Sequence, residues 1–199
     1  MPRPKVHDEA LRARLLEQAG ETLSTQGLDA LSLRRLAADA DTSTTAVYSL
    51  FGGKPALLTA LVDEAFRRLA AHLERVRTTD DPVEDLVALG LAYRDSALAD
   101  PRLYDVMFGA PVDAPAPGVR EGDRSSAQAF APLRRAADRA AAAGRLRPGA
   151  EPETVTLAVW ATLHGLTSAE LRGVGPGCAD DVKVVFETVL RATVAGWGG

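Results

Sequence analysis

Cysteine and histidine are scarce in this chain of 199 residues, which contains one cysteine, Cys178, and three histidines. A single cysteine can form neither an internal disulfide nor a cysteine zinc cluster, so no oxidising compartment is needed and we expect a cytoplasmic protein. His7, His72 and His164 are scattered, and none follows a glutamate at the three-residue spacing of di-iron sites. We therefore expect no metal and no other cofactor.

The chain also lacks long apolar runs, since none approaches the roughly 20 residues that cross a bilayer, and we expect no membrane partner. Phosphate-binding, dinucleotide-binding and serine-hydrolase motifs do not occur either, and no acid, base and nucleophile converge. The sequence thus predicts that the protein is not an enzyme. A helical interaction adaptor is disfavoured, because it would need a large exposed apolar stripe.

Aromatic residues make up only 5% of the chain, whereas alanine occurs 36 times. Alanine, leucine and arginine are strong helix formers, which predicts an all-α fold. Apolar residues recur at three- and four-residue spacing between capping residues and glycines. These patterns predict a loop over residues 109–122 and helices over residues 8–26, 33–40, 44–50, 55–77, 82–99, 101–108, 124–144, 152–173 and 179–196.

Charge divides the chain at a polar, proline-ended joint over residues 78–82. Residues 1–79 carry 11 basic and 10 acidic residues, net +1, whereas residues 80–199 carry 12 and 17, net −5. The acidity therefore belongs to the second half, and the formal net charge of −4 does not exclude a nucleic-acid partner for the first. We predict a domain boundary at this joint, with a first domain over residues 1–56, a linking helix to about residue 77, and a second domain over residues 80–199.

Two of the predicted helices are very short and are joined by a three-residue turn, residues 41–43. Helices this short cannot bury each other fully, so they need the first predicted helix behind them, as in a helix-turn-helix. In that motif the second helix enters the major groove of double-stranded DNA with its N-terminal residues. These residues are Ser43, Thr44, Thr45 and Ala46. Their hydroxyl and methyl groups can hydrogen-bond to base edges or contact a thymine methyl group.

A longer pattern surrounds this turn. It comprises Ser32 at a helix start, Leu36-Ala37, Ala40-Asp41-Thr42-Ser43, and Val47-Tyr48-Ser49-Leu50-Phe51-Gly52-Gly53-Lys54-Pro55-Ala56-Leu57. From Gly27 to about Leu61 the chain resembles the TetR family of transcriptional regulators. The resemblance implies DNA contacts from the positioning helix, the recognition helix and two phosphate-binding side chains. The implied residues are Ser32 and Arg34, then Ser43, Thr44 and Thr45, and finally Tyr48 and Lys54.

Three positions depart from the family pattern. Asp41 stands where the turn glycine is usual, which is tolerable because aspartate can adopt left-handed backbone geometry. Thr42 replaces a buried valine with a side chain of similar shape. Leu50 stands where the family often has a phosphate-contacting histidine, so we do not expect that contact.

Trp160 and His164 are one helical turn apart in the predicted helix 152–173. We interpret them as part of a ligand cavity; the alternative is that they are core or interface residues. Further candidate walls are Tyr93, Tyr104, Met107, Phe108 and Phe130. The pattern from Trp160 to Gly165 also resembles the Trp-His-Gly type of TetR C-terminal domain. That resemblance implies a homodimer joined through the last two helices, and it identifies no ligand.

Small and β-branched residues form strips on these last two predicted helices, where a helix of a second copy could approach closely. The strips are Ala161, Gly165 and Ala169, and Val185, Val189, Ala192 and Gly196. A monomer could use both strips internally. A homodimer is favoured because one half-site binds weakly and a dimer doubles the contacts. We therefore predict a homodimeric transcriptional regulator that represses by binding a palindromic operator. A small, mostly apolar molecule is expected to release it from the DNA. The alternative is an all-helical small-molecule-binding or enzymatic module without DNA binding.

Overall fold

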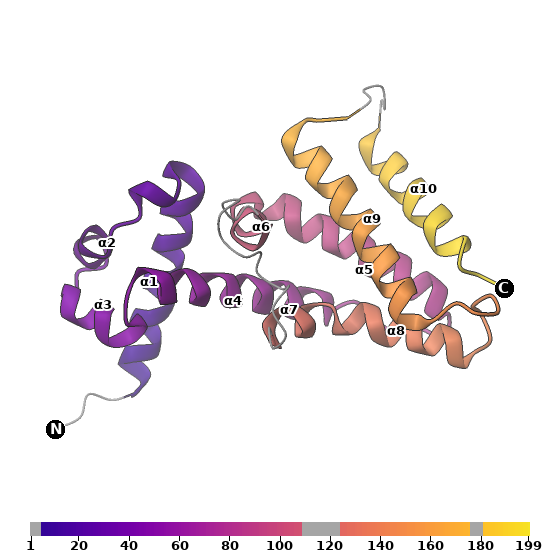
Figure 1. Ribbon diagram of the computed structural model, residues 1–199, viewed down its shortest axis with the longest axis horizontal. Coiled ribbons are helices and arrows are strands. Elements are labelled where there is room, and N and C mark those ends of the chain that lie inside the picture. The colour runs from indigo at the N-terminus through magenta and orange to yellow at the C-terminus, as the bar shows by residue number, and fades with distance from the viewer. Residues whose placement is uncertain (1–4, 109–123, 176–180) are drawn as a thin grey trace. The chain divides into compact units, whose positions relative to one another are not determined.

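The computed structural model describes residues 5–108, 124–175 and 181–199 (Figure 1). Within these ranges the chain forms ten α-helices and one 3-10 turn and no strand, which confirms the predicted all-α fold. The elements are α1 (Lys5–Gln26), η1 (Leu28–Ala30), α2 (Leu33–Asp39), α3 (Thr44–Phe51), α4 (Lys54–Leu73), α5 (Pro82–Ala99), α6 (Pro101–Phe108), α7 (Arg124–Ala129), α8 (Ala131–Ala142), α9 (Pro152–Arg172) and α10 (Val182–Ala195).

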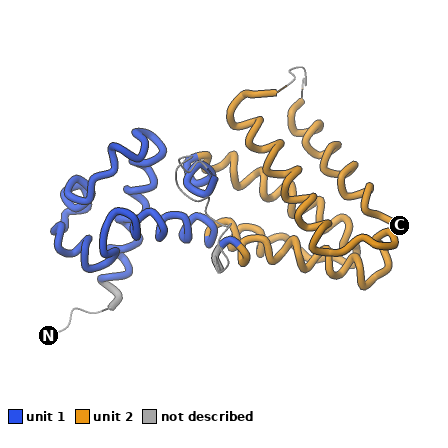
Figure 2. The backbone as a smooth tube through the Cα atoms, in the orientation of Figure 1, with its two compact units in different colours: residues 1–67, 102–126 blue, residues 68–101, 127–199 orange. Residues whose placement is uncertain are grey.

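These elements form two compact units (Figure 2). Unit 1 comprises residues 1–67 and 102–126, and unit 2 comprises residues 68–101 and 127–199. The helix α4 begins in unit 1 and ends in unit 2. Unit 1 therefore also contains most of α6, which follows the predicted joint at residues 78–82 in the sequence.

In unit 1, α1 packs against both short helices, α2 and α3. Leu15 and Ala19 of α1 are fully buried, as is Val47 of α3. Gln18 of α1 donates a hydrogen bond to the main-chain oxygen of Asp39 at the end of α2. Because α2 and α3 have only seven and eight residues, this support from α1 is what allows them to bury their apolar sides.

Unit 2 is a bundle of α5, α8, α9 and α10, in which α5 and α9 contact each other and both of the remaining helices. The side chains of α9 and α10 pack tightly against Gly90 of α5, where an added Cβ would lie 2.5 Å from Leu190 Cδ2 and 2.8 Å from Leu163 Cδ2. A partly buried ion pair joins two of the helices, with Arg94 Nε 2.8 Å from one Glu170 oxygen and Nη2 2.5 Å from the other. This bidentate geometry fixes the lateral register of α5 and α9.

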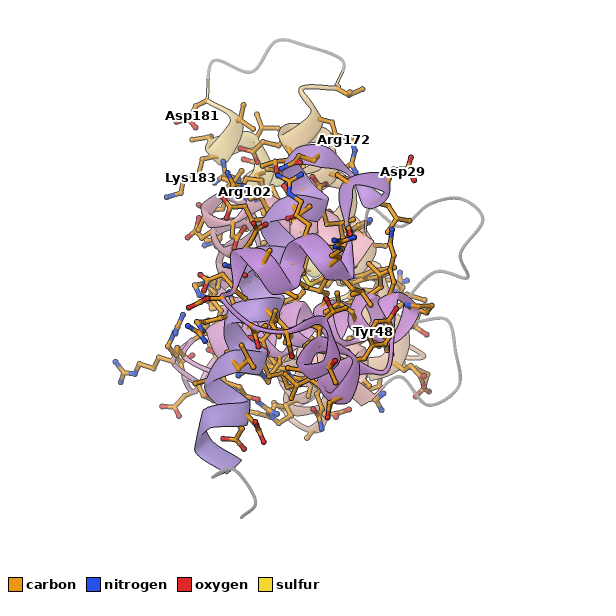
Figure 3. The ribbon with its side chains drawn as sticks, turned by 90° about the vertical axis from the view of Figure 1, so that its left-hand side faces the viewer. Asp29, Tyr48, Arg102, Arg172, Asp181 and Lys183 are labelled. Carbon is orange, nitrogen blue, oxygen red and sulfur yellow. The ribbon has the colours of Figure 1, made fainter. Side chains whose placement is uncertain are left out.

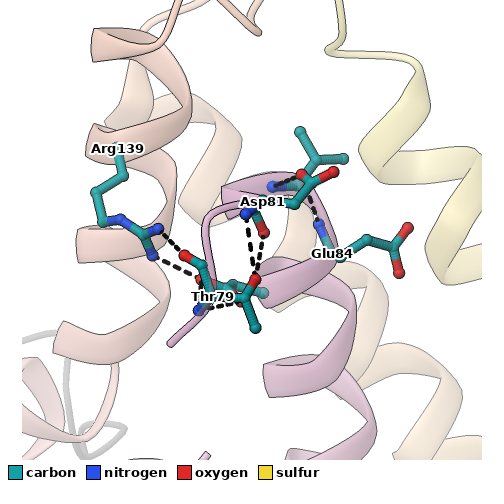
Figure 4. Close-up of polar contacts among 6 residues, drawn as sticks. Thr79, Asp81, Glu84 and Arg139 are labelled. Carbon is teal, nitrogen blue, oxygen red and sulfur yellow. Dashed lines mark hydrogen bonds and ion pairs between the residues drawn. The ribbon is translucent and has the colours of Figure 1, made fainter. Parts of the chain in front are cut away.

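A second polar network holds the segment before α5 against α8 (Figure 4). The Asp85 carboxylate accepts hydrogen bonds from the Thr79 hydroxyl at 2.7 Å and the Thr79 N–H at 3.1 Å. Arg139 of α8 donates to the same carboxylate at 2.6 Å and also to the main-chain oxygen of Thr79. Asp81 caps α5 by accepting from the N–H groups of Val83 and Glu84. The predicted joint is thus an ordered turn in this structure.

Several predicted boundaries were wrong. The predicted helix 124–144 is two helices separated at Phe130, because Pro132 lacks an N–H group and favours the start of a new helix. The linking helix ends at Leu73 rather than near residue 77, and the chain continues in tighter turns. The last helix begins at Val182. Ser32 occupies the N-cap of α2 but its side chain makes no capping bond. Cys178 and the predicted loop 109–122 lie outside the described residues.

Candidate functional site

The turn between α2 and α3 has the backbone geometry that its sequence predicted. Asp41 has φ of 49°, and it is the one non-glycine residue with positive φ in the described part of the chain. Aspartate visits this left-handed region more easily than most side chains, which confirms that it can replace a turn glycine. Ser43 Oγ accepts a hydrogen bond from the N–H of Ala46 at 3.1 Å and so caps α3. The direction in which α3 leaves the turn is therefore specified locally.

The helix α3 buries one side and exposes the other. Val47 is fully buried and Phe51 is 7% exposed, so they anchor the helix in unit 1. Tyr48 is 53% exposed (Figure 3). Thr45 and Ser49 are also exposed. Thr44 and Leu50 are half-buried, so Leu50 does not reach the core as Val47 does. The first turn of α3 and the Tyr48 phenol therefore form one exposed polar surface.

The basic residues around this surface are not equivalent. Arg34 of α2 is exposed and, within the described residues, has no hydrogen bond or ion pair. The neighbouring Arg35 contacts Gln26 Oε1 at 3.1 Å and the Asp39 carboxylate at 3.7 Å. Arg34 is thus available to a phosphate, whereas Arg35 is held against its own unit.

Lys54 has a contact within unit 1 that the sequence did not predict. Its ammonium group is half-buried and donates to the main-chain oxygen of Leu28 at 2.7 Å, which ties the first residue of α4 to η1. Arg12 of α1 similarly lies over the ring of Phe51, 5.5 Å from its centroid. Neither contact could be inferred from sequence, because 26 residues separate Lys54 from Leu28 and no motif relates them. The first contact joins α4 to η1, and the second joins α1 to α3.

A cluster of aromatic side chains lies in unit 2 between α5, α8 and α9. The rings of Trp160 and His164 are stacked at 5.4 Å with an interplanar angle of 18°, and Phe130 meets Trp160 edge-on at 5.6 Å. The Tyr93 hydroxyl is 3.5 Å from His164 Nδ1. The structure thus brings together four of the seven predicted ligand residues.

Two polar groups in this cluster are chemically notable. The indole N–H of Trp160 is buried and has no hydrogen-bond acceptor among the described residues. Burial lowers the pKa of His164 below its ordinary value, and the charge of Arg172 lowers it further. The imidazole is therefore neutral at pH 7, and the Trp160 N–H is a donor that an acceptor could satisfy.

The other three predicted ligand residues lie in unit 1, on α6. Tyr104 and Met107 are buried, and Phe108 is half-buried. The Phe108 ring meets Phe66 of α4 edge-on at 5.8 Å and the Tyr104 ring at 4.9 Å. The predicted set is therefore divided between the two units, with four residues in unit 2 and three in unit 1.

The helices α9 and α10 each expose an apolar strip. Leu157 is 59% exposed, and Val182, Val185 and Val189 of α10 are also exposed. Gly165 is exposed in the middle of α9, and an added Cβ there would meet nothing within 4 Å. Glycine within a helix costs about 1 kcal/mol relative to alanine, and nothing among the described residues requires it at this position.

Residues 5–108, 124–175 and 181–199 contain no group of three or more His, Cys, Asp or Glu that could hold a metal ion. In the same ranges no single helix is long and apolar enough to cross a membrane. The consecutive helices α3 and α4 reach the necessary length and apolar composition only when they are taken together, and they are bent by 63° at their junction.

Two family models match the chain. The model described as "Bacterial regulatory proteins, tetR family" matches residues 15–61, which include α2 and α3. The model described as "Tetracyclin repressor-like, C-terminal domain" matches residues 86–193, more than half of the chain. The more specific Trp-His-Gly type of C-terminal domain stays a prediction.

Individual proteins resemble the chain over nearly its whole length. The HTH-type transcriptional regulator Rv1816 of Mycobacterium tuberculosis is 27% identical over 94% of this chain and 92% of its own. A structure of a protein of unknown function from Rhodococcus sp. RHA1 superposes with a TM-score of 0.79 and 32% identity, covering 95% and 96% of the two chains. A SmeT–triclosan complex has a TM-score of 0.71 and 25% identity, covering 96% and 92%.

Proposed function

The chain belongs to the TetR family of DNA-binding transcriptional regulators, and from this premise we propose that it is a repressor which a small, mostly apolar molecule releases from a palindromic operator. The main observation in support of DNA binding is the exposed first turn of α3. The Asp41 turn and the Ser43 cap determine the direction of this helix. We assign DNA reading to residues 1–56, ligand binding and dimerisation to residues 80–199, and the site of action to the cytoplasm.

The proposed DNA contacts follow the exposure of the side chains. Thr44 and Thr45, with the Ser43 hydroxyl, would face base edges from the N-terminal turn of α3. The Tyr48 phenol, the Arg34 guanidinium and the Ser32 hydroxyl would contact phosphates on either side. Lys54 can reach a phosphate only with the donors that its bond to Leu28 leaves unused.

We propose that the repressor is a homodimer. A palindromic operator presents two identical half-sites, and a two-fold dimer presents two recognition helices at the required spacing of about 34 Å. The exposed valines Val185 and Val189 of α10 and the open face of Gly165 on α9 supply an apolar surface that a second copy would cover. In this dimer, α9 and α10 of both copies would form a four-helix interface, and Gly165 would allow the helix backbones to approach closely.

We further propose that the unit 2 cluster receives the effector. Trp160, Phe130 and Tyr93 would contact an apolar or aromatic body. The indole N–H of Trp160, which has no acceptor among the described residues, would bind one acceptor atom of the molecule. His164 is neutral at pH 7, so the cluster does not need an anionic effector to balance its charge. The triclosan complex of SmeT, which resembles this chain along its length, supports a small-molecule effector. Tyr104, Met107 and Phe108 remain a second candidate cluster, in unit 1.

The proposed mechanism is a change in the spacing of the two recognition helices. The helix α4 follows α3 directly and continues into unit 2, so a tilt of α4 would move α3 away from its major groove. This requires the effector to bind the DNA-incompetent state more tightly, because equal affinity for both states shifts nothing.

The proposal is tested by footprinting the full-length protein on DNA that flanks its own gene and on duplexes selected from a random pool. We expect two protected half-sites related by a two-fold axis. Arg34→Glu should abolish protection, whereas Arg134→Glu, the matched reversal at an exposed arginine of α8, should preserve it. Equal, unselective binding of all duplexes by the parent protein would show that it does not read an operator.

A further inference from the structure

The exposed side of α3 carries no charged or amide side chain. Its eight residues are Thr44, Thr45, Ala46, Val47, Tyr48, Ser49, Leu50 and Phe51. Arginine and lysine read guanine, and asparagine and glutamine read adenine, through paired hydrogen bonds in the major groove. Because α3 has none of these four residue types, it cannot make such paired contacts with a purine.

The basic residues near α3 do not replace them. Lys54 donates to the Leu28 oxygen, and Arg12 lies over the Phe51 ring behind the helix. Arg35 contacts Gln26 and Asp39. Arg34 is available, but it lies on α2, the helix that crosses the DNA backbone in this motif.

The remaining groups on the first turn of α3 are small. Ser43 Oγ accepts from the Ala46 N–H, so this hydroxyl is partly committed to capping the helix. Thr45 is exposed in the same turn and carries both a γ-methyl and a hydroxyl group. A threonine methyl is apolar and fits against the 5-methyl group of thymine, the one apolar group that a base pair presents in the major groove.

We propose that α3 reads thymine by apolar contact, with the γ-methyl of Thr45 packed against the 5-methyl group of one thymine in each operator half-site. The inference rests on the proposed function and deepens it by naming the chemistry of the operator. Sequence discrimination then comes from buried methyl groups, while phosphate contacts from Tyr48 and Arg34 supply affinity without base preference.

The test begins with a duplex that the full-length protein enriches from a random pool. Each thymine of this duplex is replaced in turn by deoxyuridine, which removes only the 5-methyl group. Burial of one methyl-sized group predicts about fourfold weaker binding at the contacted thymine of each half-site. Thr45→Ser, which removes the methyl and keeps the hydroxyl, should bind the thymine and deoxyuridine duplexes equally. Thr45→Val, which keeps the methyl, should retain the preference.

Other outcomes would overturn the inference and leave the proposed function intact. One is an enriched duplex in which no deoxyuridine replacement weakens binding. A second is a guanine preference that Arg34→Ala removes, and a third is a cytosine preference that Asp41→Asn removes, since aspartate can accept from the cytosine amino group. Failure of the parent protein to enrich any sequence would contradict the proposed function as well.

Discussion

Lys54 Nζ donates a hydrogen bond to the main-chain oxygen of Leu28 at 2.7 Å, which connects the start of α4 to the turn that follows α1. The recognition helix α3 lies between these two points in the sequence. The contact therefore closes a loop of chain that contains the entire helix-turn-helix. A lysine that the family pattern relates to phosphate binding thus also has a structural contact in this chain.

Lys54→Ala should lower the free energy of unfolding by roughly 1.5 kcal/mol, because a charged donor is lost and the half-buried Leu28 oxygen loses its partner. Urea unfolding followed by circular dichroism measures the change. Arg34→Ala is the control, since Arg34 has no hydrogen bond or ion pair within the described residues. A Lys54→Ala protein as stable as the parent would mean that the contact is not maintained in solution.

Tyr48→Phe should weaken binding to operator and random duplexes by the same factor, roughly tenfold, because a hydrogen bond to a phosphate carries no sequence information. Fluorescence anisotropy with both duplexes at one salt concentration measures the two affinities. The random duplex serves as the internal control. A loss confined to the operator would assign the phenol to a base edge.

Asp85 should make stability depend on pH. Burial raises the pKa of Asp85, but hydrogen bonds from Thr79 and Arg139 outweigh burial, and the net pKa lies below its ordinary value. A carboxylate with a lowered folded-state pKa stabilises the fold fully above its unfolded-state pKa of about 3.9, and this stabilisation is lost as pH falls through the folded-state pKa.

Asp85→Asn should therefore be less stable than the parent by roughly 2 kcal/mol at pH 6, with the difference shrinking toward pH 3. Urea unfolding across this range measures it. Asp80→Asn, at an exposed aspartate beside Thr79, is the control. A difference between Asp85→Asn and the parent that stays constant with pH would exclude a role for the carboxylate charge.

Gly165→Leu should convert the proposed dimer to a monomer without unfolding it. The single chain has open space at Gly165, and leucine favours a helix more than glycine does. A second copy packed closely against α9 would collide with the new side chain. Sedimentation at micromolar concentration measures the mass. Ala195→Leu, at an exposed position of α10 outside the valine strip, is the control. A dimeric Gly165→Leu protein would place the interface elsewhere.

The local elements were largely predictable from sequence. Asp81 before Pro82 marks the start of α5, and Ser43 marks the start of α3, because a capping side chain bonds backbone groups two or three residues away. Asp41 could be recognised as the turn residue from its tolerance of positive φ. The break at Phe130 was missed, although Pro132 was the available signal, because the alanine periodicity continues across it.

The candidate site was predictable only in part. The pair Trp160 and His164 follows from helical spacing, and their stacking confirms that they share a face of α9. Phe130 is 30 residues before Trp160 in the sequence, and no local rule predicts that the two rings meet. Nor does any local rule predict that Tyr104, Met107 and Phe108 belong to unit 1 while the other candidate ligand residues belong to unit 2.

The sequence by itself determined the helices, the helix-turn-helix and the exposed first turn of α3, because propensity, capping and periodicity act over three or four residues. Only the tertiary structure decided which side chains are available for function. Arg34 and Arg35 are adjacent in sequence, yet one is unpaired within the described residues and the other is held by Gln26 and Asp39. Burial and pairing depend on residues brought together by folding, so a linear pattern cannot separate a binding side chain from one that stabilises the fold.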